Sequence, residues 1–260
     1  MLNIKKILAC VLAVSLLFLC GCSSTPSQPE TALPTETEPA TASTTLPTGP
    51  ASTEPEVQLH SGIRDDGSFD SGTLFIGDSL TNAFIFDNLM LYHRIGDAQY
   101  MAMVGAPVHV YFLGPVLSRE QPCIHSGFTN MTFAQGVESV GSEITAVYFM
   151  MGSNYSEYTT YETYDEIVTH LLEHCPNATI YLQTIPYSTS EVVQYELVNG
   201  ILEELYLVYA ESVDTRVMLI DTHTALGDRL QDDGVHINYE AQDIWYQTIL
   251  DFAQENNIPQ

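Results

Sequence analysis

The sequence FIGDSLTNAF (Phe75–Phe84) joins a short apolar run to a segment with helical spacing, and a small polar serine stands at the junction. A buried strand followed by a helix explains this order, because Gly and Asp favour turns and Asp or Ser caps helices. A second explanation is chemical: a serine held where a strand gives way to a helix can act as a nucleophile. That explanation requires a base, a carboxylate and an oxyanion site elsewhere in the chain.

Four more apolar runs resemble the run at Thr73–Gly77, and each has the length of a strand that is buried on both faces. They are Ala98–Gly105, Thr145–Gly152, Ala178–Thr184 and Arg216–Thr222. The segments Leu80–Leu91, Tyr161–Cys175, Val192–Tyr209 and Asn238–Ala253 have apolar residues at helical spacing, and Asn238 is the candidate N-cap of the last one. This alternation predicts an α/β fold, a three-layer α/β/α sandwich with a central five-stranded parallel sheet.

Three of the predicted strands end in residues that suit a ligand site. These ends are Gly77-Asp78-Ser79, Val104-Gly105-Ala106 and Met151-Gly152-Ser153-Asn154. Ligands of open parallel sheets bind at the carboxyl ends of the strands, near the point where the strand order reverses. We therefore expect Ser79 to share one sheet edge with two glycines and an amide side chain.

A candidate base lies just before the last predicted helix, in Asp232-Asp233-Gly234-Val235-His236. An aspartate three residues before a histidine can turn back onto the imidazole, which fixes its tautomer and stabilises the imidazolium. Asp233 has this spacing, and Asp232 beside it is the alternative carboxylate. On the loop alone, a turn followed by a core histidine explains the pattern as well.

The four blocks, in this order, resemble the GDSL or SGNH hydrolase family, whose fold is flavodoxin-like. The resemblance covers most of Ser71–Phe252, and TIYLQTIPYS (Thr179–Ser188) also looks like the strand before a substrate loop in cell-surface members. Members of the family often carry Asp after the Asn of the third block, whereas this chain has Tyr155. That Asp is structural in the family, so the change bears little on the chemistry.

The resemblance implies a role for each matching residue. Ser79 would be the nucleophile and would offer its own backbone N–H to the oxyanion. Gly105 would supply a second backbone N–H, and Asn154 a side-chain N–H. His236 would act as base and then as acid, with Asp233 orienting its ring. Several donors aimed at one oxygen are what a tetrahedral acyl intermediate needs.

Two other groups of residues have both a functional and a structural explanation. His170 and His174 have the i, i+4 spacing of metal ligands, but no third ligand is evident and an exposed helix face explains them. We therefore expect no metal and no cofactor. The tyrosines of the segment 155–164 either stack on sugar rings or cover a loop and begin a helix.

The N-terminal residues indicate export. Residues 1–21 have Lys5 and Lys6 followed by an apolar run too short to span a bilayer, which is typical of a signal peptide. Leu19-Cys20-Gly21-Cys22 resembles the bacterial lipoprotein signal, which implies a lipid anchor at Cys22 on the outer face of the cell membrane. An ordinary signal peptide with a chance cysteine is the alternative.

Composition divides the rest of the chain. Residues 22–57 are rich in Ser, Thr, Pro and Glu and hold seven of the 13 prolines, so we expect a disordered tether. Residues 58–260 are enough for one domain with a sizeable core.

Both lysines belong to the signal segment, which leaves 7 − 2 = 5 basic residues against 33 acidic ones and argues against a nucleic-acid partner. Cys123 and Cys175 remain in the domain; pairing outside the cell is one alternative, and we expect two separate, mostly buried thiols.

Together these features predict a lipid-anchored serine esterase without metal or cofactor. We expect it to hydrolyse small acyl esters, O-acetyl groups above all, on carbohydrate or cell-envelope glycan, through an acyl-enzyme intermediate. One alternative is transfer of the acyl group to a glycan hydroxyl by the same triad. The other is a non-catalytic, surface-tethered glycan-binding module.

Overall fold

The computed structural model describes residues 58–113, 123–125, 128, 130–259, which belong to one compact unit. The predicted signal peptide, the tether and Cys22 lie outside the described residues. Within the described ranges, no helix is both long enough and apolar enough to cross a membrane.

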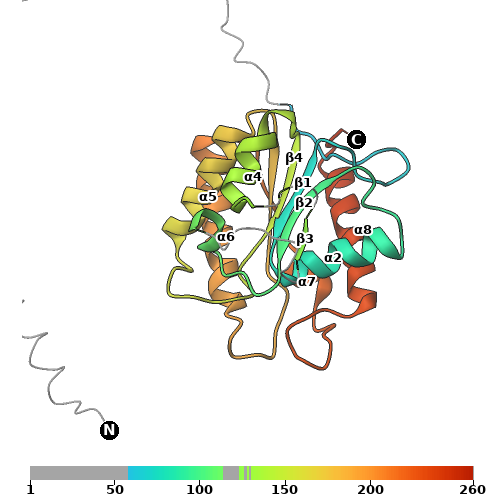
Figure 1. Ribbon diagram of the computed structural model, residues 1–260, viewed down its shortest axis with the longest axis vertical. Helices are drawn as coiled ribbons and strands as arrows, with labels where there is room; N and C mark the ends of the chain where they lie inside the picture. Colours follow the sequence, from blue (N-terminus) through green and yellow to red (C-terminus); the bar gives the residue numbers. More distant parts are fainter. Residues whose placement is uncertain (1–57, 114–122, 126–127, 129, 260) are drawn as a thin grey trace, which may run out of the picture. The chain divides into compact units, whose positions relative to one another are not determined.

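A six-stranded sheet in the order β3-β2-β1-β4-β5-β6 forms the centre of the unit (Figure 1). Its strands are β1 (Thr73–Gly77), β2 (Gln99–Met103), β3 (Cys123–His125), β4 (Ala146–Met150), β5 (Thr179–Gln183) and β6 (Val217–Ile220). All neighbouring pairs are parallel except β2 with β3. The predicted five-stranded parallel sheet is therefore confirmed, and a short antiparallel strand that the sequence did not indicate extends its edge.

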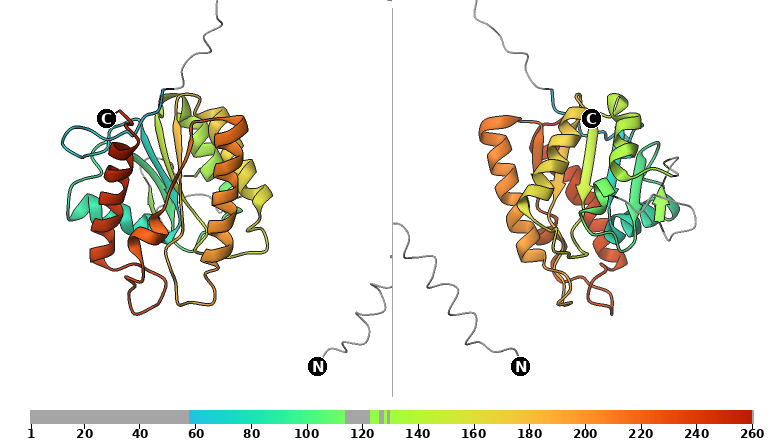
Figure 2. Two further views of the ribbon diagram at one scale, coloured as in Figure 1. Left: turned by 180° about the vertical axis from the view of Figure 1, so that it is seen from behind. Right: turned by 60° about the vertical axis from the view of Figure 1, so that its left-hand side comes forward.

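Helices cover both faces of the sheet, as the α/β/α prediction requires (Figures 1 and 2). Helices α4, α5 and α6 lie on one face, and α2 and α8 lie on the other. The helices are α2 (Ser79–Met90), α3 (Val110–Leu113), α4 (Phe133–Val140), α5 (Tyr161–His174), α6 (Tyr195–Val208), α7 (Thr222–Leu226) and α8 (Tyr239–Glu255), with a 3₁₀ turn η2 (Gly141–Glu143) and a π-helical turn η3 (Tyr209–Val213). The four predicted helices are confirmed, whereas α3, α4 and α7 were not predicted.

The core is built where strands are buried on both faces. Every residue of β1, β4 and β5 is buried. Phe75, Tyr148 and Tyr181 are in register on these strands, and their rings stack with centroid distances of 5.1 and 4.7 Å. The hydroxyls of the two tyrosines donate to the backbone carbonyls of Ser61 and His60, so their burial leaves no polar group unsatisfied.

The strand order defines where a ligand site belongs. After β1 the chain places β2 on one side of it and β4 on the other, which makes the β1–β4 boundary the point of reversal. The carboxyl ends of β1 and β4 lead directly to Ser79 and to Gly152. The loops 184–194 and 227–238 lie at this same edge, at the lower end of the sheet in Figure 1.

Candidate active site

Asp78 links the carboxyl ends of β1 and β4. One carboxylate oxygen accepts from Leu80 N at 3.0 Å, which makes Asp78 the N-cap of α2. The other accepts from Gly152 N at 3.1 Å, from Ser153 N at 3.0 Å and from Ser153 Oγ at 2.8 Å. Burial raises the pKa of Asp78, and these hydrogen bonds oppose the rise. The sequence suggested a capping role for this aspartate, but nothing in it indicated the link to β4.

Asp78 caps α2, so the side chain of Ser79 is not needed as the N-cap. Ser79 is the first residue of α2 and is 6% exposed. Among the described residues, its hydroxyl has no hydrogen-bond partner within 3.5 Å, so no bond to His236 is formed. Its backbone N–H is among the first of the helix, where unpaired amides and the helix dipole favour negative charge.

Asn154 is held beside the segment that contains Gly105. Its side-chain nitrogen donates to Ser153 Oγ at 3.2 Å and to the Ala106 carbonyl at 3.4 Å. Since Ser153 Oγ also donates to Asp78, a chain of hydrogen bonds runs from the start of α2 through β4's end to the segment after β2. The structure thus brings together the backbone segments of Ser79, Gly105 and Asn154, as the sequence predicted for one sheet edge.

Gly105 and Gly152 both have a positive φ, and packing gives a further reason for glycine at position 152. Gly105 has φ +75°, which other residues adopt at a cost, and a Cβ there would meet no atom within 4 Å. The space above Gly105 is therefore open. A Cβ on Gly152 would come within 2.6 Å of the Tyr164 hydroxyl, so close packing requires glycine there.

His236 is paired with Asp233 within the loop before α8. Its Nδ1 lies 2.6 Å from Asp233 Oδ2, and Asp233 Oδ1 accepts from the backbone N–H groups of Val235 and His236 at 3.0 and 2.9 Å. The hydrogen bond from His236 and those from the backbone lower the pKa of Asp233 to about 2. The carboxylate that contacts the imidazole is thus Asp233. The pairing occupies Nδ1 and leaves Nε2 of His236 to accept or donate a proton.

The loop that carries this pair is fixed to its neighbour. Ser188 Oγ and Thr189 N both donate to the carbonyl of Gly234, at 2.7 and 3.0 Å. Asn238 then caps α8 by accepting from Ala241 N, as predicted. These bonds hold the pair at the carboxyl edge of the sheet, against the loop that follows β5. That loop also lines a surface depression of about 420 Å³, which runs along residues 188–197.

The structure divides the tyrosines of the segment 155–164 into two groups. Tyr164 is fully buried and donates to the Met151 carbonyl at 2.8 Å, and Tyr161 packs against the core. Tyr155 and Tyr158 are 41% and 53% exposed. The ring of Tyr158 lies 4.9 Å from that of His109. Two of the four tyrosines are thus structural, and the other two form an exposed rim, defined as Tyr155 and Tyr158, in the segment that follows Asn154.

The structure also places Cys175 and the pair His170 and His174. Cys175 is a buried free thiol, and the side chain of Cys123 lies outside the described residues. His170 and His174 lie near Glu138 of α4, a third group of metal-ligating type.

The fold and the site define a class of protein: a doubly wound α/β/α domain with a serine after its first strand and an Asp–His pair before its last helix. No protein-family model matches the sequence, and no curated protein sequence does. The structure is similar to that of a GDSL-like lipase from Bacteroides thetaiotaomicron, with a TM-score of 0.50, 12% identity, and coverage of 71% of this chain and 88% of that one. It is also similar to an active-site mutant of a family two carbohydrate esterase from Clostridium thermocellum, with a TM-score of 0.50, 14% identity, and coverage of 72% of this chain and 64% of that one. At these identities the likeness shows a common fold.

Proposed function

We propose that this chain is a serine esterase of the SGNH type that removes small acyl groups, O-acetyl above all, from carbohydrate or cell-envelope glycan. The observation that carries the proposal is the Asp233–His236 pair, held at the same sheet edge as Ser79 and Asn154. His236 is partly exposed, its Nδ1 lies 2.6 Å from Asp233 Oδ2, and among the described residues no group is hydrogen-bonded to its Nε2.

The first half of the reaction forms the acyl-enzyme. His236 Nε2 takes the proton of the Ser79 hydroxyl as Oγ attacks the carbonyl carbon of the ester. The resulting oxyanion is stabilised by the N–H groups of Ser79 and Gly105 and by the Asn154 amide, near the positive end of α2. As the intermediate collapses, the bond between the acyl carbon and the sugar oxygen breaks, and the imidazolium gives its proton to that oxygen, so the sugar leaves with a free hydroxyl.

The second half restores the serine. A water molecule attacks the acyl carbon, and His236 takes its proton and then returns a proton to Ser79 Oγ as the carboxylic acid leaves. Asp233 remains ionised throughout, since its pKa is about 2, and it stabilises the imidazolium each time it forms. The absence of a Ser79–His236 hydrogen bond among the described residues is compatible with this scheme, because such bonds often tighten only when substrate binds.

The substrate class is supported by the exposed rim beside the site. Tyr155 and Tyr158 are exposed in the segment that follows Asn154, and aromatic rings pack well against the apolar faces of sugars. The predicted anchor at Cys22 and the tether at 22–57 would place the domain at the outer surface of a bacterial membrane, where glycans are at hand. Anchor, tether and location are part of this proposal.

The test is acetate release by the full-length chain from a panel of O-acetylated glycans. Ser79→Ala should lower kcat by roughly 10⁴- to 10⁶-fold, because the triad acts as a unit. Ser139→Ala, which removes a hydroxyl from α4, is the matched control and should retain parent activity. A folded Ser79→Ala variant with most of its activity would refute the nucleophile. Acetyl groups found on an added sugar acceptor, in place of free acetate, would make the enzyme a transferase. A parent that neither releases acetate nor reacts with a phosphonate probe would be a binding module.

A further inference from the structure

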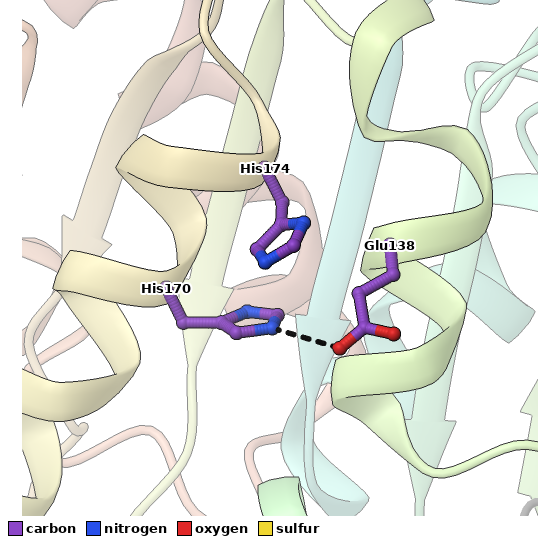
Figure 3. A group of neighbouring side chains, drawn as sticks. All are labelled: Glu138, His170 and His174. Carbon is purple, nitrogen blue, oxygen red and sulfur yellow. Dashed lines mark hydrogen bonds and ion pairs between the residues drawn. The ribbon is translucent and has the colours of Figure 1, made fainter.

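Three side chains of metal-ligating type meet between α4 and α5, away from the candidate active site. Glu138 projects from α4, and His170 and His174 project from consecutive turns of α5 toward the same space (Figure 3). The nearest ligand atoms of the three lie within 4.8 Å of one another. His170 Nε2 is 3.4 Å from Glu138 Oε1, and the two imidazole rings have a centroid distance of 4.4 Å.

The surroundings of His170 hold its ring in place, with one ring nitrogen toward Tyr111 and the other toward Glu138. Its Nδ1 lies 3.1 Å from the hydroxyl of the fully buried Tyr111, and the edges of Tyr111 and Phe112 contact the ring. Without a metal, the contact at 3.4 Å between Nε2 and Glu138 requires a proton on Nε2, and the phenol then donates to Nδ1; a metal at Nε2 selects the other tautomer, in which Nδ1–H donates to the phenol oxygen. Metal-binding histidines in proteins are commonly oriented in this way, by a hydrogen bond at the nitrogen that does not bind the metal.

A simple ion pair does not explain the whole arrangement. An ion pair accounts for His170 and Glu138 alone, and Glu138 is about half exposed, at 49%, so such a pair contributes little to stability. It gives no reason for a second imidazole to lie against the first, where two protonated rings would repel each other. Two neutral imidazoles and one carboxylate, by contrast, are a common donor set for Zn²⁺.

We propose that Glu138, His170 and His174 bind a divalent ion of the zinc class, which joins α4 to α5. Ligands at about 2.0–2.2 Å from Zn²⁺ lie about 3.3 Å apart in a tetrahedral site, so the cluster must contract on binding. The exposed Glu138 side chain is free to make this movement. Water would complete the coordination.

The position of the cluster gives the ion a structural role. His174 is the last residue of α5, and the chain then passes through Cys175 to the start of β5, at the amino edge of the sheet. Ser79 follows the carboxyl end of β1, at the opposite edge. The ion should therefore stabilise the domain and leave ester hydrolysis unchanged.

The experiment measures Zn²⁺ binding by the full-length chain after treatment with EDTA and dialysis. Calorimetric titration with ZnCl₂ should show one equivalent of bound ion. At a free Zn²⁺ concentration of 100 times Kd, the Tm should rise by roughly 5–10 °C. Glu138→Gln and His174→Gln should each weaken binding at least about 10-fold and remove the Tm rise. Glu173→Gln and His93→Gln are matched controls at exposed positions outside the cluster, and they should bind as the parent does.

Two results would overturn the proposal. One is that the parent binds no Zn²⁺. The other is that the cluster variants and the control variants bind Zn²⁺ equally, which would assign the ion to other groups. The metal-free Tm of each variant should lie close to that of the metal-free parent, which shows that the variants fold. Esterase activity that is lost with EDTA and restored by Zn²⁺ would refute the structural role.

Discussion

Replacing Asp78 by Asn tests whether this carboxylate holds the two strand ends together. The carboxylate accepts four hydrogen bonds, one from Leu80 N and three from Gly152 and Ser153, and it is fully buried. Asparagine has one carbonyl oxygen. If that oxygen faces β4, the amide nitrogen faces Leu80 N, so one buried donor loses its acceptor and the helix loses its cap.

The size of the effect follows from these bonds. A buried donor left unpaired costs about 1–3 kcal/mol, and hydrogen bonds to a charged acceptor are each stronger than those to a neutral one by about 1 kcal/mol. The neutral side chain avoids burial of a charge, the effect that raises the pKa of Asp78, and this offsets part of the loss. We therefore expect a net loss of about 2–4 kcal/mol, or a Tm lower by roughly 5–15 °C for a domain of this size.

The assay is thermal unfolding at pH 7 followed by circular dichroism, on the full-length parent and variants. Asp65→Asn makes the same change at an exposed site and should alter stability by less than about 0.5 kcal/mol. Ser153→Ala removes one of the four donors and should fall between the two. The reasoning fails if Asp78→Asn melts within about 2 °C of the parent, because the four bonds would then contribute nothing to stability.

Three further predictions concern the site, and a fourth concerns the N-terminal cysteine. Asn154→Ala should lower kcat by roughly 10²- to 10³-fold with little change in Tm, as measured with a chromogenic acetyl ester; an unchanged kcat would remove Asn154 from the oxyanion site. Asp233→Asn should lower kcat by roughly 10³- to 10⁴-fold, whereas Asp232→Asn should leave it near the parent value; the reverse result would move the triad carboxylate by one residue. Because the folded pKa of Asp233 is depressed to about 2, its contribution to stability is present above about pH 4 and is lost as the pH falls toward 2. The pair is partly exposed and screened by solvent, so this contribution is small, and Asp233→Asn should lower the Tm by no more than about 2 °C from pH 5 to pH 8. Cys22→Ser should release the protein from the membrane fraction, and equal retention of parent and variant would refute the lipid anchor.

The elements that the sequence predicted correctly are those with a strong local signal. The continuous apolar runs at Thr73–Gly77 and Ala178–Thr184 contain strands buried on both faces, and the segment Tyr161–Cys175 with helical spacing contains α5. Helix α7 and strand β3, with five and three residues, are too short to show a period. Helix α6 begins at Tyr195, later than the predicted Val192, since a backbone hydrogen bond from Val193 N to Ser190 O forms a turn first.

The candidate site likewise contains contacts between residues that are near in the sequence, which the sequence predicted, and contacts between distant residues, which it did not. Asp233 and His236 are three residues apart, so one loop brings them together and the spacing alone predicted their pairing. The bonds from Asp78 to Ser153 span 75 residues, and they exist only because β1 and β4 lie side by side in the sheet. Glu138 is 32 residues from His170, on another helix, and its place beside the two histidines depends on how α4 packs against α5. Sequence periodicity records which face of an element is buried, whereas contacts between elements depend on strand order and helix packing, which no local spacing encodes.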